Sequence, residues 1–163
     1  MQLRISGIVN DSIVDGPGLR LAVFTQGCLH NCAGCHNPQT HDVNGGYLID
    51  TDEIIEKVKA NPLLQGITLS GGEPFLQVDA SSELMEKVKH LELSTIIYTG
   101  FMWEELMDNV NLKRLALMAD YVIDGKFIQE YKTLDMAFAG SSNQRIIDVK
   151  QTIENGEIII CKI

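Results

Sequence analysis

Four short apolar runs, each followed at once by a polar or glycine-rich segment, are the feature that most constrains the fold of this chain. The runs occupy residues 21–25, 67–70, 94–98 and 121–123. Their length and apolar character predict buried β-strands. The segments that follow them begin at Gln26, Gly71, Thr99 and Asp124. A helical pattern lies between each run and the next, and a strand–helix alternation of this kind predicts a parallel sheet with helices on its faces.

The helical patterns cover residues 51–60, a segment capped by Ser81 or Ser82, and residues 103–118 with a break at Asn111. Two further strands are expected at 145–149 and 157–163, joined by a hairpin turn at Asn155-Gly156. A chain of 163 residues is too short for the roughly 250 residues of a complete eight-unit barrel. We therefore predict one α/β domain over residues 1–163, a partial, open (β/α) barrel with a C-terminal β-hairpin.

The carboxyl ends of parallel strands meet at one edge of a sheet, where α/β proteins place their active sites. The unusual polar and glycine-rich residues of this chain all follow such strand ends. They are the segments 28–35, 71–74, 99–100 and 124–126. We expect these four segments to converge on one site.

Cys28, Cys32 and Cys35 follow the first strand with the spacing C-x3-C-x2-C. Thiolates suit zinc or iron–sulfur clusters. Three of them can hold three irons of a [4Fe–4S] cluster, whereas an electron-transfer cluster normally takes four cysteines. A fourth iron without a protein ligand would suit the binding of a substrate. Cys161 lies in an apolar run and is expected to be structural, as buried free cysteines usually are.

Two other interpretations of the cysteines remain open from the loop alone. Cys32 and Cys35 could form a thioredoxin-like redox pair, although this leaves Cys28 unexplained. The three cysteines with His30 or His36 could instead form a Cys3His zinc site in a structural or adaptor domain.

Composition and charge indicate the partners and the cellular compartment that suit these thiols. The net charge of -9 argues against a general binder of nucleic acid or of anionic membranes. No apolar run approaches the ~20 residues of a membrane span, and the first residues show no signal-peptide pattern. We therefore expect a cytoplasmic protein, in which clustered thiols indicate metal binding or catalysis rather than disulfides.

Several motifs together resemble the glycyl-radical-enzyme activases of the radical S-adenosylmethionine (SAM) superfamily. The first set is Asp15-Gly16-Pro17-Gly18-x-Arg20, the cysteine loop ending in Cys35-His36-Asn37-Pro38, and Ser70-Gly71-Gly72-Glu73-Pro74. A second set resembles the activases whose protein substrate is anaerobic ribonucleoside-triphosphate reductase. That set is Tyr98-Thr99-Gly100, Asp124-Gly125-Lys126-Phe127 and Gly140-Ser141-Ser142-Asn143-Gln144-Arg145. The resemblance extends from about residue 8 to 147.

The resemblance implies the partial barrel of the radical SAM type and a mechanism. A [4Fe–4S] cluster would bind SAM at its open iron and receive one electron from a flavodoxin-like donor. SAM would be cleaved to methionine and a 5′-deoxyadenosyl radical, which would abstract hydrogen from a backbone glycine of the reductase. The protein binds and orients a cofactor that carries the hard chemistry.

The resemblance also implies roles for single residues. The catalytic residues and cluster ligands would be Cys28, Cys32 and Cys35. The cofactor-binding residues would be Gly34, Cys35, His36, Gly71, Gly72, Glu73, Thr99, Asp124 and Lys126.

Among these, Gly71 and Gly72 would line the methionine end of SAM, where a Cβ on Gly72 would intrude on the ligand. Glu73 would pair with the SAM ammonium group, and Lys126 with its carboxylate. Gly34 replaces the aromatic residue usual between the second and third cysteines, so backbone near it and His36 would face the adenosine. The histidines are expected at the surface or near the ligands rather than as ligands.

A second radical SAM function also fits the cysteines and the Gly-Gly-Glu-Pro segment. An enzyme acting on a small molecule, such as a deazapurine synthase, would share both features. The short chain favours the activase, because little of it remains to enclose a small substrate, whereas a protein partner can complete an open mouth.

Overall fold

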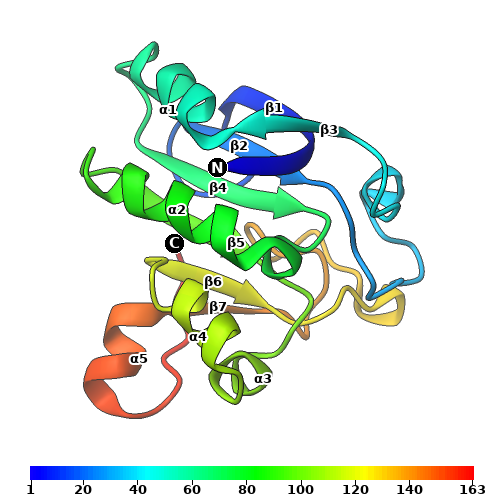
Figure 1. The fold of residues 1–163 in the computed structure, drawn as a ribbon. Coiled ribbons are helices and arrows are strands. Elements are labelled where there is room, and N and C mark those ends of the chain that lie inside the picture. The colour runs from blue at the N-terminus through cyan, green and yellow to red at the C-terminus, as the bar shows by residue number, and fades with distance from the viewer.

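The computed structural model describes all 163 residues and is built on one seven-stranded sheet (Figure 1). In spatial order its strands are β3 (Tyr47–Asp50), β1 (Gln2–Ser12), β2 (Arg20–Thr25), β4 (Gly66–Gly71), β5 (Ser94–Tyr98), β6 (Tyr121–Asp124) and β7 (Arg145–Asp148). The middle four strands, β2, β4, β5 and β6, run parallel. β1, β3 and β7 are antiparallel to their neighbours. The sheet does not close, so the predicted open α/β architecture is confirmed.

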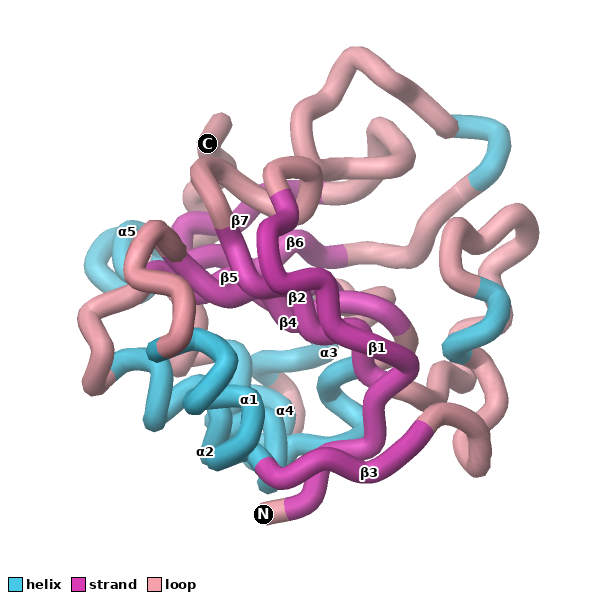
Figure 2. Tube along the Cα trace, turned by 90° about the horizontal axis from the view of Figure 1, so that it is seen from above, coloured by secondary structure: helices cyan, strands magenta, loops and turns pink.

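The helices follow the strands they connect. They are α1 (Thr51–Lys59), α2 (Val78–Lys89), α3 (Trp103–Met107), α4 (Val110–Ala116) and α5 (Val149–Asn155), with three short 3-10 turns at Pro38–Thr40, Pro74–Gln77 and Gln129–Tyr131. Viewed from above, α1 to α4 lie together on one face of the sheet (Figure 2). None of these helices has both the length and the apolar content needed to cross a membrane.

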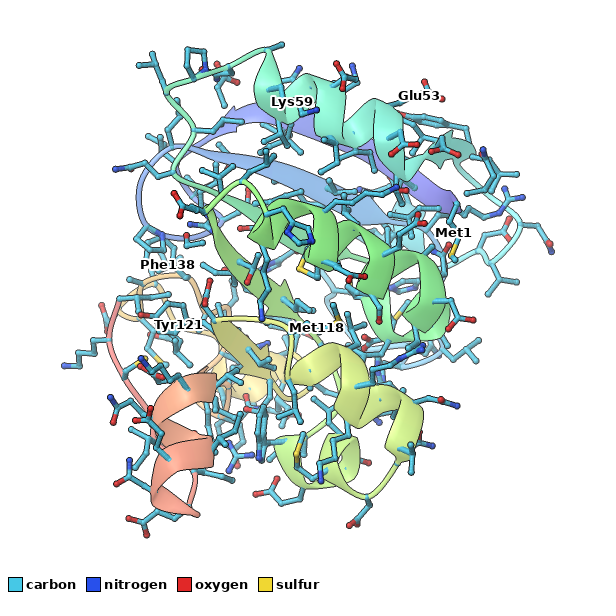
Figure 3. The ribbon with its side chains drawn as sticks, turned by 60° about the vertical axis from the view of Figure 1, so that its left-hand side comes forward. Met1, Glu53, Lys59, Met118, Tyr121 and Phe138 are labelled. Carbon is cyan, nitrogen blue, oxygen red and sulfur yellow. The ribbon has the colours of Figure 1, made fainter.

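The alternation of side chains along each strand divides the core between the two faces. Ile97 and Val122 point toward the helices and join the main core cluster. Their neighbours Ile96 and Ile123 point to the opposite face, in a smaller cluster that Phe138 and the C-terminal residues partly cover. Helix α1 shows the matching pattern, because its apolar side faces the core while charged residues such as Glu53 and Lys59 project outward (Figure 3).

The parallel register brings the carboxyl ends of β2, β4, β5 and β6 to the same edge, as predicted. Thr25 of β2 pairs with Gly71 of β4, and Tyr98 of β5 pairs with Ile123 of β6. The loops that leave this edge lie on the right in Figure 1, beyond the arrowheads of the strands.

Several predicted details are wrong. The C-terminal hairpin is absent: residues 149–155 form α5, and Gly156 caps that helix with φ 70° instead of turning a hairpin. The chain does return to β7, but through a single bridge between Ile147 and Ile160. Helix α2 begins at Val78, so Ser81 and Ser82 lie inside it. The break before α4 is at Asn109, whose side chain caps the helix, and not at Asn111.

Arg20 holds the Asp15-Gly16-Pro17-Gly18 segment, which precedes β2, against the sheet. Its guanidinium group is 1% exposed and lies across the amino ends of the parallel strands. It donates to Thr68 Oγ1 and to the carbonyl oxygens of Pro17, Ile67 and Ser94, at 2.8–3.2 Å. No carboxylate accepts from it, and burial lowers its pKa to about 10. The segment is therefore fastened to the sheet by a buried cation.

We expect Arg20→Ala to destabilise the protein by about 3 kcal/mol, because it removes a hydrogen-bonded cation and leaves buried carbonyl groups unpaired. Urea unfolding of the purified chain measures the change. The control is Arg114→Ala, which removes a half-exposed surface ion pair with Asp79 and should cost less than about 1 kcal/mol. Equal losses in the two variants would contradict the assignment.

Candidate functional site

A cavity of ≈900 Å³ opens at the carboxyl edge of the parallel strands. Its walls come from the residues after β2, β4, β5 and β6, together with the β1–β2 loop and the segment before β7. Eight of the predicted site residues line it: Cys28, Cys32, Cys35, His36, Gly71, Gly72, Thr99 and Lys126. Gly34, Glu73 and Asp124 do not.

The three cysteines of the cavity sit on the loop between β2 and the Pro38–Thr40 turn, and all three are free thiols of intermediate exposure. The base of the loop is fixed because Gly27 N donates to Thr40 O and Cys28 N donates to His41 O. Burial raises the pKa of the Cys28 and Cys32 thiols.

The donor set fits a cluster better than a single ion. No three His, Cys, Asp or Glu side chains of the chain converge closely enough to hold one metal ion. A Cys3His zinc site needs such convergence, since its ligands all lie about 2.0–2.3 Å from one atom. In a [4Fe–4S] cluster each cysteine binds a different iron, so three thiols that line one cavity without converging on one point are compatible with it.

Gly71 and Gly72 are required by the fold at the end of β4. Gly71 has φ 88°, and a Cβ there would meet the backbone of Phe24. Gly72 N donates to Thr25 O at 2.8 Å, and a Cβ on Gly72 would strike the carbonyl oxygen of Gly27. The missing side chain of Gly72 faces the start of the cysteine loop, so the fold itself requires a glycine here, and a clash of this Cβ with SAM stays a prediction.

We expect Gly72→Ala to lower stability by about 1–3 kcal/mol, because it overpacks the contact between β4 and the cysteine loop. Thermal and urea unfolding of the cluster-free chain measure the loss. Gly7→Ala is the matched control, since a Cβ at Gly7 meets nothing within 4 Å. A Gly72→Ala variant with normal stability and weakened SAM binding would restore the ligand-contact interpretation.

Glu73 occupies the centre of the site's framework and is 1% exposed. Its Oε1 accepts from Phe75 N at 3.1 Å, and its Oε2 accepts from Gly100 N at 2.9 Å and from His30 Nε2 at 2.5 Å. The Thr99 hydroxyl donates to the same carboxylate. These protein groups satisfy the carboxylate within the fold, and the pairing of Glu73 with a SAM ammonium group stays a prediction.

Asp124 is also engaged within the protein. It is fully buried, its Oδ2 accepts from Trp103 N at the start of α3, and both oxygens pair with Arg145. The arrangement holds β6, β7 and α3 together and leaves Asp124 outside the cavity lining. Asp124 therefore has a structural role in the fold, and its role in binding SAM stays a prediction. Arg145 also pairs with Glu104, and the two carboxylates raise its pKa.

Lys126 differs from Asp124 because it is exposed and lines the cavity. The turn that carries it is held by the Ser141–Arg145 stretch. Asn143 Nδ2 donates to Lys126 O, and Gln144 Nε2 donates to Gly125 O. The function of the Gly-Ser-Ser-Asn-Gln motif within the fold is therefore to shape this turn, which presents the one lysine of the cavity.

The remaining predicted residues lie around the same opening. His36 is exposed and its ring lies 4.8 Å from the ring of Phe127. Gly34 adopts φ 71° beside Gln129, outside the lining. Sequence reasoning missed the apolar residues Ile13 and Val14 of the β1–β2 loop, which line the cavity and are more than 70% exposed. Their apolar character next to the Asp15 motif was the available signal.

The comparisons with known proteins agree on the same part of the chain. Residues 14–147 match the family described as 4Fe-4S single cluster domain. The chain is 33% identical over 141 residues to the anaerobic ribonucleoside-triphosphate reductase-activating protein of Escherichia coli strain K12, which aligns 81% of this chain with 90% of that protein. The protein of the same name from Enterobacteria phage T4 is 32% identical over 139 residues, aligning 82% of this chain with 86% of that one.

Two further proteins are more distant in extent or in sequence. The pyruvate formate-lyase-activating enzyme of Clostridium pasteurianum is 34% identical over 123 residues, an alignment that covers 70% of this chain and 52% of the enzyme. The crystal structure of QueE from Escherichia coli aligns with 61% of this chain and 53% of that chain at 15% identity and a TM-score of 0.49. The last likeness is too low to support an inference.

Proposed function

Because this chain belongs to the family of anaerobic ribonucleoside-triphosphate reductase-activating proteins, we propose that it generates the glycyl radical of such a reductase. It does so as a radical SAM enzyme with a [4Fe–4S] cluster. The observation that carries the proposal is one cavity lined by three free cysteines, the Gly71-Gly72 pair and Lys126. The cluster and SAM together supply the one-electron cleavage that yields a 5′-deoxyadenosyl radical.

The chain's own residues have separate tasks in this proposal. Cys28, Cys32 and Cys35 hold the cluster as thiolates, and binding displaces their protons. Lys126 supplies a positive charge in the cavity, which suits the carboxylate of SAM. Gly71 and Gly72 place backbone, without side chains, at the wall between the cysteine loop and β5. His36 and the backbone near Gly34 lie on the side of the loop where we place the adenosine.

The shape of the opening supports a protein substrate. Ile13, Val14 and Leu134 line the cavity and are 71%, 73% and 94% exposed. Exposed apolar side chains that gather around one opening are typical of a protein-binding surface. A partner segment that covers them would also close the cavity to water, which protects a reactive radical.

The proposal includes a setting for the reaction. We propose a flavodoxin-like protein as the electron donor and neither nucleic acid nor membrane as a partner, in keeping with the net charge of -9. The four free cysteines suit the reducing cytoplasm, where we place the protein.

Single replacement of Cys28, Cys32 or Cys35 by Ser should abolish the intact cluster, because each thiolate holds a different iron. Anaerobic reconstitution followed by iron and sulfide analysis and the visible spectrum measures cluster content. Reductive SAM cleavage and the radical signal of added anaerobic reductase measure function. Cys161→Ser is the control and should behave as the parent. A requirement for Cys161, or a zinc-binding colourless protein, would refute the assignment, as would full activity after prolonged exposure to air.

We expect Leu134→Asp to reduce radical formation on the reductase about tenfold, as loss of one apolar anchor in an interface does. SAM cleavage without the reductase should stay unchanged, because the side chain is 94% exposed at the rim. Electron paramagnetic resonance of the reductase measures the first quantity and 5′-deoxyadenosine release the second. Ile153→Asp, an equally apolar but remote exposed site on α5, is the control. Equal radical yields from the two variants would place the partner elsewhere.

A further inference from the structure

His30 is the most deeply buried anchor in the outer part of the cysteine loop. Leu29 is 74% exposed, and Asn31, Ala33 and Gly34 are exposed as well. Among the side chains of residues 29–34, His30 makes the hydrogen bond to another side chain, whereas the Cys32 thiol accepts from the backbone of Phe127. The His30 side chain is only 11% exposed. The segment that carries Cys28 and Cys32 therefore has a single buried attachment between its two cysteines.

The place into which His30 fits is formed by residues beyond the ends of β4 and β5. Its Nε2 donates to Glu73 Oε2 at 2.5 Å. Its ring meets the ring of Phe101 edge-on, with the centroids 4.7 Å apart. Gly100 leaves room for it, since a Cβ there would lie 2.5 Å from His30 Cδ2. Three residues from two strand ends thus enclose one histidine of the loop.

The carboxylate that receives His30 cannot shift to follow the loop. Glu73 is fixed by Phe75 N, by the Thr99 hydroxyl and by Gly100 N. A buried carboxylate with several donors has a well-defined position, because moving it would leave charged oxygens unpaired. The His30–Glu73 contact therefore fixes the cysteine loop relative to the edge of the sheet.

We propose that His30, acting through Glu73, is the positioning residue of the cysteine loop and orders Cys28 and Cys32 before the cluster is inserted. The inference deepens the proposed function and rests on it only in taking the loop as the cluster-binding loop. Glu73 serves the protein framework in this account and not the SAM ammonium group.

The test measures thiol alkylation in the cluster-free, reduced full-length chain. Iodoacetamide is added, and mass spectrometry follows each cysteine separately. His30→Met fills the same space without a donor, whereas His30→Gln keeps an N–H donor. His30→Met should raise the alkylation rates of Cys28 and Cys32 about fivefold, as the loss of one hydrogen bond to a charged group allows. His30→Gln should remain within about twofold of the parent, as should the surface control His90→Ala.

Cys161 in the same molecule is the internal reference, since it lies against Ile146 of β7 and is not part of the cysteine loop. Its rate should stay constant in every variant. The double variant His30→Met/Glu73→Gln should be no faster than the faster single variant, because both changes break one contact. After reconstitution, a chelator should remove iron from His30→Met about fivefold faster than from His30→Gln.

The proposal would be overturned if His30→Met left the alkylation rates of Cys28 and Cys32 unchanged, or if His30→Met and His30→Gln raised them equally. It would also be overturned if the rate increases of His30→Met and Glu73→Gln multiplied in the double variant. The result is separable from the proposed function, because alkylation needs neither cluster nor SAM. If Glu73→Gln left the alkylation rates of the cysteines normal but changed the affinity for SAM, Glu73 would be a SAM-binding residue and not a positioning residue of the loop.

Discussion

Parallel pairing between β2 and β4 is the interaction on which the site depends. The pairing ends with Thr25 opposite Gly71, and two backbone hydrogen bonds continue it beyond the strands. Gly72 N donates to Thr25 O and Glu73 N donates to Gly27 O, both at 2.8 Å. The cysteine loop and the Gly-Gly-Glu-Pro segment, some 40 residues apart in the chain, are therefore joined at their first residues. Each later element of the site is placed relative to this junction.

The sequence was sufficient to predict the parallel core and the convergence of the site. Both follow from rules that act along one strand at a time: short apolar runs form the strands, and parallel strands bring their carboxyl ends together. The three cysteines, Thr99 and Lys126 lie around one cavity for this reason. The antiparallel strands β1 and β3 were missed, because residues 2–12 and 47–50 lack a continuous apolar run and gain their order from pairing.

The protein partners of Glu73 and Asp124 could not be predicted from the sequence, and both cases have the same physical cause. Glu73 and Asp124 carry charges at strand ends, where a ligand is the simplest partner to imagine from sequence. In the folded chain these carboxylates bind donors from the protein itself. Trp103 of α3 and Arg145 of β7 donate to Asp124, and His30 of the cysteine loop donates to Glu73. Long-range partners such as Arg145 for Asp124 follow no sequence spacing that a local pattern could reveal. The Asn155-Gly156 pair predicted a hairpin turn but ends helix α5, because a glycine with left-handed backbone suits a helix end as well as a hairpin.

The outward side of the cysteine loop has a consequence for how an oxidant would reach the site. Leu29, Asn31, Ala33 and Gly34 face solvent, whereas the Glu73 carboxylate and the base of the loop are hydrogen-bonded within the protein. A cluster held by this loop would therefore have one side turned toward solvent, and a small oxidant could reach that side without the displacement of any strand.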